Sequence, residues 1–277
     1  MRTMPCGGAL LCVTLALAPS LAVLAQAAAP ERRGASKARP KVSLEEVAIM
    51  LAASEEDEVR SALEAAALLP AREVIPLIEE RVRGGLTLVL LDVSLDTLLL
   101  LADPSAGPLL FDLARHRRPT IRARALDVLA RLKVEGAEQV ATRGLADLEP
   151  EVRKAAAEAL GILKARGALE PLVRAFELGV EGAARAIGQV ASSADVARLL
   201  EYVGNQSPST LTPLFEELFA RRDIADAEKL RSAERIAALN SDEAREQLAA
   251  LLAALPRDAS GPVRRALTQV APLEQSP

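Results

Sequence analysis

The side chains best suited to acid–base, nucleophilic or metal chemistry are few in this chain of 277 residues. His116 is the only imidazole, and no second histidine or thiol lies near it in the sequence to complete a set of metal ligands. We interpret it as a solvated loop residue after a helix, a position in which the helix dipole favours a cation. The only thiols, Cys6 and Cys12, both lie near the start of the chain.

Adjacent carboxylates could act as a general acid and base if burial separated their pKa values. Examples of such groups occur at residues 55–58, 79–80 and 216–217, and each falls where an exposed helix face or helix N-terminus is expected. The sequence has no glycine-rich phosphate loop, no Gly-x-Ser-x-Gly elbow and no His-Glu-x-x-His motif. We therefore predict that the protein is not an enzyme and that it holds no metal ion and no cofactor.

Residues 1–27 have the form of a secretory signal peptide. Arg2 precedes an apolar run over residues 9–18, and Ala25 and Ala27 supply the small residues of a cleavage site. Cleavage after Ala27 would remove both cysteines and export the rest of the chain to the periplasm or cell envelope, or out of the cell. The alternative is an uncleaved anchor, because residues 7–29 are nearly long enough to span a bilayer.

Residues 28–42 are predicted to be a disordered basic linker, because residues 30–41 hold five Lys and Arg and show no apolar periodicity. The charge then changes sign, since residues 42–277 contain 28 Lys and Arg but 37 Asp and Glu, a net charge of −9. A body of this charge is unsuited to binding nucleic acid through phosphate contacts. Residues 273–277 are expected to form a disordered tail.

The body, residues 43–272, is predicted to be all helical. Aromatic residues make up only 2% of the chain, and Ala and Leu, which dominate the apolar positions, lead the helix propensity scale. Ser43 and Glu46 have the spacing of a capping box, so a first helix is expected to start near residue 43 and a second to cover residues 58–69. Continued to residue 271, the pattern gives about fifteen helices and no strand. The longest later apolar run, residues 86–102, contains two aspartates, so no transmembrane helix is expected after the signal peptide.

These helices repeat. Residues 119–126 align with residues 150–157, and the same signal, an apolar residue followed by Arg, recurs at Val59-Arg60 and Val263-Arg264. Other helices place Pro in a predicted first turn, within residues 73–78, 105–110 and 168–173. Five pairs of matching positions lie 31 residues apart: Ile121 and Val152, Ala125 and Ala156, Leu129 and Leu160, Leu132 and Leu163, and Gly136 and Gly167.

This unit resembles the HEAT-like repeat, in the short variety found in phycobilisome lyases and in many bacterial proteins. The motifs that carry the resemblance are Val152-Arg153, Ala155-Ala156, Ala159-Leu160-Gly161 and Pro171-Leu172-Val173. The resemblance implies an α-solenoid of stacked antiparallel helix pairs, a HEAT-like or armadillo-like superhelix, over about residues 43–272. It is weaker over residues 86–101, which are leucine-rich and lack the Arg, and over residues 205–256, so the repeat boundaries stay open there.

Four glycines have predicted structural roles in this unit. Gly161 and Gly188 are expected to allow neighbouring helices to approach closely. Gly136 and Gly167 are expected to end helices in the left-handed conformation. The first helix and the last, near residues 262–271, are expected to cap the stack.

If helices with the Val-Arg signal line the inner surface, as in the resembled family, a basic strip forms there although the body is acidic. Such a strip would suit an acidic peptide, protein or polysaccharide. The alternative is structural, with Arg122 and Arg153 binding carbonyls or loop acids of a neighbouring repeat. The candidate partner-binding residues are Arg122, Arg124, Arg131, Arg153, Lys154 and Arg185.

Two classes of function follow. The first is a non-catalytic interaction scaffold or adaptor in the bacterial cell envelope, which binds a protein partner, acidic in character, along the solenoid surface. The second is an enzyme or enzyme subunit related to chromophore lyases, which the resemblance permits but export argues against. The identity of the partner, the retention of the signal as an anchor, the oligomeric state and the role of the basic linker are open at this point.

Overall fold

The structure of the protein, a computed structural model, describes residues 42–270 and contains fifteen α-helices and four short 3-10 helices over that range. Those residues form no strand, only an isolated bridge between Val203 and Gln206. The all-α solenoid predicted from the sequence is therefore confirmed. The signal peptide, nearly all of the basic linker, the tail at residues 273–277 and both cysteines lie outside the described residues.

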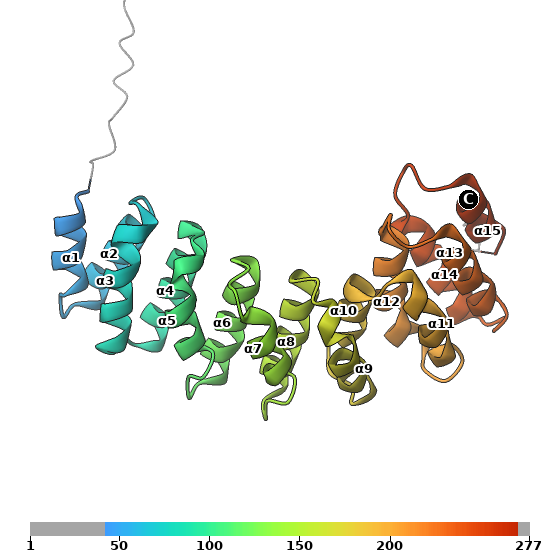
Figure 1. Ribbon diagram of the computed structural model, residues 1–277, viewed down its shortest axis with the longest axis horizontal. Helices are drawn as coiled ribbons and strands as arrows, with labels where there is room; N and C mark the ends of the chain where they lie inside the picture. Colours follow the sequence, from blue (N-terminus) through green and yellow to red (C-terminus); the bar gives the residue numbers. More distant parts are fainter. Residues whose placement is uncertain (1–41, 271–277) are drawn as a thin grey trace, which may run out of the picture. The chain divides into compact units, whose positions relative to one another are not determined.

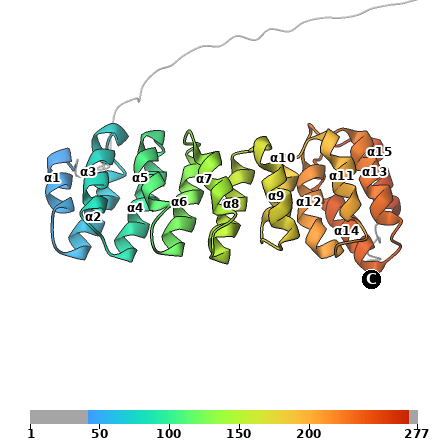
Figure 2. The ribbon, with the colours of Figure 1, turned by 60° about the horizontal axis from the view of Figure 1, so that its bottom comes forward.

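The helices stand side by side in chain order and form two layers (Figures 1 and 2). The even layer consists of α2 (Glu56–Ala66), α4 (Leu88–Leu101), α6 (Pro119–Arg131), α8 (Pro150–Ile162), α10 (Ala183–Val190), α12 (Pro208–Ala220) and α14 (Asp242–Ala254). The odd layer consists of α1 (Leu44–Leu51), α3 (Ala71–Arg83), α5 (Gly107–Leu113), α7 (Ala137–Gly144), α9 (Leu169–Glu177), α11 (Val196–Leu199), α13 (Asp226–Ala237) and α15 (Gly261–Val270). Each even helix packs on the next even helix throughout, whereas α5, α7 and α9 contact one another less.

The start of the stack follows from local chemistry. Ser43 caps α1, because its side chain accepts a hydrogen bond from the amide of Glu46 while the Glu46 carboxylate accepts from the Ser43 amide at 2.8 Å. This reciprocal pair satisfies backbone donors that the first turn of a helix leaves free, and it holds the pKa of Glu46 below its usual value. The predicted capping box is confirmed. The second helix starts earlier than predicted, at Glu56, and ends at Ala66.

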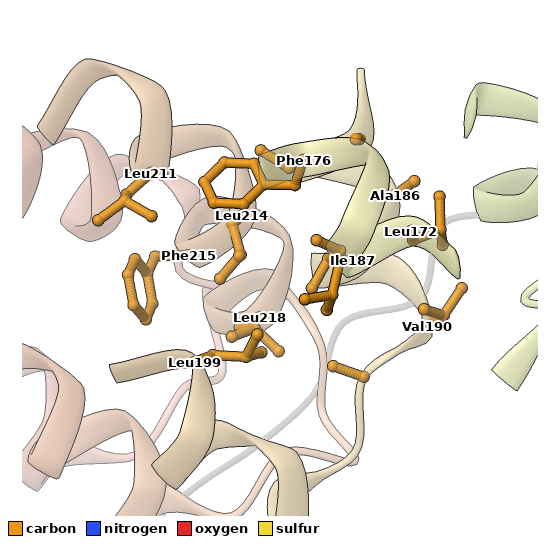
Figure 3. Close-up of a cluster of buried hydrophobic side chains, with 14 of the residues drawn as sticks. Leu172, Phe176, Ala186, Ile187, Val190, Leu199, Leu211, Leu214, Phe215 and Leu218 are labelled. Carbon is orange, nitrogen blue, oxygen red and sulfur yellow. The ribbon is translucent and has the colours of Figure 1, made fainter. Parts of the chain in front are cut away.

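The core is a continuous layer of apolar side chains between the two rows of helices. It is built almost wholly of Ala, Leu, Val and Ile, and α6 joins its two halves, because Leu129 packs with the N-terminal cluster and Leu126 with the C-terminal one. Phe215 and Ile187 are fully buried where α10 meets α12 (Figure 3). Since each helix pair covers its apolar face only with the help of its neighbours, the stack is stabilised by nearest-neighbour contacts.

Two glycines bring helices close together, as predicted. A Cβ on Gly188 would lie 2.7 Å from Cβ of Glu217 on α12, and one on Gly161 would lie 3.3 Å from Cα of Ala186 on α10. A side chain at either position would push successive even helices apart.

The prediction for the other two glycines is wrong in part. Gly136 is left-handed, with φ of 87°, but it precedes α7 instead of ending α6. Gly167 is not left-handed. It lies in a 3-10 turn, Arg166–Ala168, and the left-handed residues after α6 and α8 are Lys133 and Lys164, with φ of 50° and 52°.

Two other repeat assignments need correction. Pro76 lies inside α3, because that helix begins at Ala71, whereas Pro108 and Pro171 do lie in first turns. Val263 lies on α15 in the odd layer, so its Val-Arg signal does not mark the repeat position that Val152 occupies on α8.

Among residues 42–270, no helix combines the length and the apolar character needed to cross a bilayer.

Candidate interaction surface

The first Val-Arg arginine is part of the stacking. Arg122, on α6, binds Asp147 in the loop before α8 through two parallel hydrogen bonds of 2.9 and 2.7 Å. Its remaining terminal nitrogen donates to the carbonyl of His116 at 2.9 Å. The side chains of the pair are only 16% and 18% exposed. The hydrogen bond lowers the pKa of the Asp147 carboxyl and raises the pKa of Arg122, as a charge-assisted pair should.

The equivalent residue of the next repeat, Arg153, also binds the loop before its helix. Arg153, on α8, donates to the carbonyls of Asp147 at 2.9 Å and Leu148 at 2.8 Å. Each arginine therefore closes the loop that precedes its own helix, and Asp147 joins the two repeats. Arg122 and Arg153 therefore bind loop carbonyls and a loop acid, as the structural alternative to partner binding predicted. Their N–H groups donate hydrogen bonds within the fold.

The other cations of the predicted strip belong to ion pairs on the even layer. Each successive pair joins neighbouring elements about one repeat apart in sequence, except for the pair between Arg131 and Asp127, which lies within α6. The pairs between elements are Arg124 of α6 with Asp92 (3.0 Å) and Asp96 of α4, Lys154 of α8 with Glu181 before α10, and Arg185 of α10 with Glu217 of α12 (2.8 Å). The hydrogen bond that Lys154 donates to the Glu181 carboxylate raises the pKa of Lys154.

Five of the six predicted residues therefore lie along the even layer as bridging or loop-closing groups. Acids supplied by neighbouring repeats offset the positive charge. Arg131, at the end of α6, is the sixth, and its side chain is 53% exposed. A role for these residues in binding a partner stays a prediction. The ion pairs neutralise the positive charge that was expected to attract an acidic partner, but they do not exclude binding.

His116 lies in the loop after α5, as predicted, but it is half-buried. Its Nδ1 accepts a hydrogen bond from the amide of Arg118 at 3.2 Å. Burial lowers the pKa of the imidazole, and the positive charges of Arg117 and Arg118 lower it further. The neutral imidazole is therefore favoured over the cation that was predicted to interact with the helix dipole. The described part of the chain contains no cluster of three or more His, Cys, Asp or Glu placed to hold a metal ion.

A groove of about 800 Å³ on the even layer lies across α2, α4 and α6. Leu88 and Val89 at the start of α4 line it and are 42% and 52% exposed. A helix can turn only about half of its circumference inward, so in a run of four apolar residues two must face out while Leu90 and Leu91 are buried. Arg124 and its acid partners form the polar wall of the groove. The leucine-rich departure of residues 86–101 from the repeat pattern was the signal in the sequence for this surface.

Comparison with known proteins identifies the repeat. A family model described as HEAT repeats matches residues 107–180, which cover α5 to α9. Residues 107–180 are HEAT repeats. The HEAT-like repeats predicted from the Val-Arg and Ala-Leu-Gly motifs are thus confirmed in this segment, and the two layers of helices continue the same architecture on either side of it.

The solved structures that are similar to this chain include the following two. One is the complex of CpcE and CpcF of phycocyanin lyase from Nostoc sp. PCC7120, at 19% identity and a TM-score of 0.45, covering 91% of this chain and 98% of that one. The other is a designed armadillo repeat protein, at 18% identity and a TM-score of 0.30, covering 83% of this chain and 98% of that one. No curated protein matches the chain.

Proposed function

We propose that this protein is a non-catalytic interaction scaffold that binds a protein partner through the groove across α2, α4 and α6. The observation that carries the proposal is the exposed apolar pair Leu88 and Val89 at that groove, next to an ion-paired polar wall. Apolar side chains inside a polar rim are the arrangement from which protein interfaces draw most of their binding energy. The repeat architecture supports the proposal, because stacked helix pairs present extended surfaces to partners.

The groove favours an apolar partner surface with little net negative charge. Asp92, Asp96 and Glu151 line it against Arg60 and Arg124, so its acids outnumber its cations. An acidic partner is therefore not expected at this groove, in contrast to the expectation from the sequence. The polar wall fixes register and orientation more than it adds affinity.

The test is affinity capture with the full chain as bait from an envelope extract, comparing two charge-introducing variants. Leu88→Glu with Val89→Glu alters the groove, and Leu148→Glu with Leu178→Glu is the matched control, because those leucines are 92% and 83% exposed in loops elsewhere. We expect a partner that the wild type and the control retain and the groove variant loses. Recovery of the same partners by all three baits, or of none by the wild type, would refute the groove as the interface.

The proposed location is the cell envelope, and it is supported by the signal-peptide pattern of residues 1–27. Cell fractionation with N-terminal sequencing tests it, and we expect a mature chain that starts at Ala28 in the envelope fraction. A chain that retains Met1 in the cytoplasm would overturn this part of the proposal. Visible absorbance from a tetrapyrrole on the purified chain would favour the second class, a subunit related to chromophore lyases.

A further inference from the structure

A second groove opens on the odd layer, where α5 and α7 contact each other less than the even helices do. Its volume is about 590 Å³, and Phe111 and Val140, both half-buried, line it. The ring of Phe111 lies over the start of α7, because its Cζ is 3.5 Å from the place where a Cβ on Gly136 would stand. The apolar part of the groove thus has an aromatic face accessible from solvent.

Three cations line this groove, and two acids, Asp112 and Glu135, line it as well. Arg83, Arg115 and Arg143 follow or end three successive odd helices, α3, α5 and α7, and all three are exposed. Arg83 pairs with Glu79 at 2.5 Å and lies 3.6 Å from Asp112. Within residues 42–270, the guanidinium groups of Arg115 and Arg143 form no hydrogen bond and no ion pair.

This differs from the even layer, where each cation of the predicted strip has a hydrogen-bond partner, in most cases about one repeat away. The loop that follows Arg115 adds two further exposed arginines, Arg117 and Arg118, and their charge contributes to the lowered pKa of His116 after the larger effect of burial. Arg143 lies in the last turn of α7, where it stabilises the helix dipole. That interaction involves the charge of Arg143, and it leaves the five N–H groups of the guanidinium free to donate hydrogen bonds to a ligand.

We propose that this groove binds an acidic peptide segment of a protein partner, with carboxylates on Arg115 and Arg143 and an apolar side chain on Phe111 and Val140. This site is separate from the proposed groove across α2, α4 and α6 and lies on the other layer. Charge complementarity carries the choice of occupant, because guanidinium groups bind carboxylates through paired hydrogen bonds. The net charge of −9 on residues 42–277 repels a polyanion at long range. An acidic segment is therefore attracted only close to the arginines of this groove.

The experiment uses the full chain and a short fluorescein-labelled peptide in which glutamates flank a central pair of leucines. Fluorescence anisotropy measures its affinity at low and at physiological ionic strength. We expect binding that weakens as salt rises, with a lysine version and a version with serine in place of leucine both binding at least about tenfold more weakly. Equal binding of the lysine version, or no binding of the glutamate peptide, would overturn the proposal. Tighter binding of an oligothymidylate would also overturn it in favour of a nucleic acid.

Variants locate the site. Arg115→Glu with Arg143→Glu should weaken the glutamate peptide at least about tenfold, whereas the charge-matched control Arg72→Glu with Arg174→Glu should change its affinity less than about twofold. Both control arginines are exposed on odd helices and do not line the groove. Arg115→Gln with Arg143→Gln repeats the test with less risk to folding, which circular dichroism checks. Unchanged affinity in either groove variant, or an equal loss in the control, would refute the site.

The two grooves are separable by the same assay. Leu88→Glu with Val89→Glu should leave the affinity for the glutamate peptide unchanged, because that pair lies on the even layer. If this variant loses as much peptide affinity as Arg115→Glu with Arg143→Glu, the peptide contacts both grooves. That result would refute a separate site on the odd layer.

Discussion

Replacing Arg122 by alanine tests whether the Val-Arg arginine holds the repeats together. The change leaves the Asp147 carboxylate, whose side chain is only 18% exposed, without its paired donor, and it removes the donor to the carbonyl of His116. Hydrogen bonds to charged groups contribute about 1.5–3 kcal/mol, and breaking a fully buried pair costs about 3–5 kcal/mol. Because this pair retains some solvent contact, we expect the free energy of unfolding to fall by about 2–3 kcal/mol.

The control is Arg131→Ala on the same helix. Arg131 pairs with Asp127 at i,i+4, but its side chain is 53% exposed. Exposed pairs at this spacing contribute about 0.3–0.5 kcal/mol because solvent screens them. Urea unfolding followed by far-ultraviolet circular dichroism measures both variants. Similar losses for Arg122→Ala and Arg131→Ala would contradict the reasoning from burial.

A double-mutant cycle between Arg122 and Asp147 isolates their interaction, with an expected coupling of about 1–2 kcal/mol at pH 7. The pKa of Asp147 is lowered in the folded state by the hydrogen bond from Arg122. A group with a lowered folded pKa stabilises the fold at pH values above its unfolded pKa, about 3.9, and that stabilisation is lost as the pH falls through the folded value. The coupling should therefore be constant from pH 7 to pH 5 and decline below about pH 4. A coupling below about 0.5 kcal/mol at pH 7, or one that persists at pH 2, would refute the assignment.

Three further changes test the packing, each by urea unfolding. Gly188→Ala places a Cβ against Glu217 and should lower the free energy of unfolding by about 1–3 kcal/mol, and a neutral effect would show that α10 and α12 can separate at little cost. Lys229→Met removes the 3.0 Å hydrogen bond from a nearly buried ammonium to the carbonyl of Phe219 near the end of α12, and should cost about 1–3 kcal/mol. Lys164→Gly relieves a left-handed residue with φ of 52° and should stabilise the protein by up to about 1 kcal/mol, so that a destabilised variant would count against backbone strain at this turn.

The fold could be predicted because its signals are local or repeat at a fixed spacing. The Ser43 capping box acts over three residues, and the register between Val152 and Ile121 is visible in one sequence. The left-handed turns at Lys133 and Lys164 were missed because glycine is the usual residue for that conformation, whereas lysine adopts it at both positions.

The candidate site was harder to predict because a strip of cations and a series of ion pairs contain the same basic residues. The difference depends on acids about one repeat away, as Asp92 is from Arg124 and Glu217 is from Arg185. Sequence spacing places these residues on helices, but whether their side chains meet depends on the rotation of one even helix against the next. The structural alternative was strongest for the Val-Arg arginines Arg122 and Arg153, and the loop-closing role is the one observed there.

Departures from the repeat are therefore better indicators of a binding surface than the repeat itself. A residue that recurs from one unit to the next serves what those units share, which is stacking, and Arg122 and Arg153 illustrate this. A surface used at one place in the stack requires side chains that the equivalent positions lack. Of the two unpaired arginines at the odd-layer groove, Arg115 corresponds 31 residues later to Ala146, whereas Arg143 corresponds to Arg174. The leucine-rich start of α4 replaces the Val-Arg signal altogether. At the first of these places the stack exposes unpaired cations beside an aromatic ring, and at the second it exposes apolar side chains beside a polar wall.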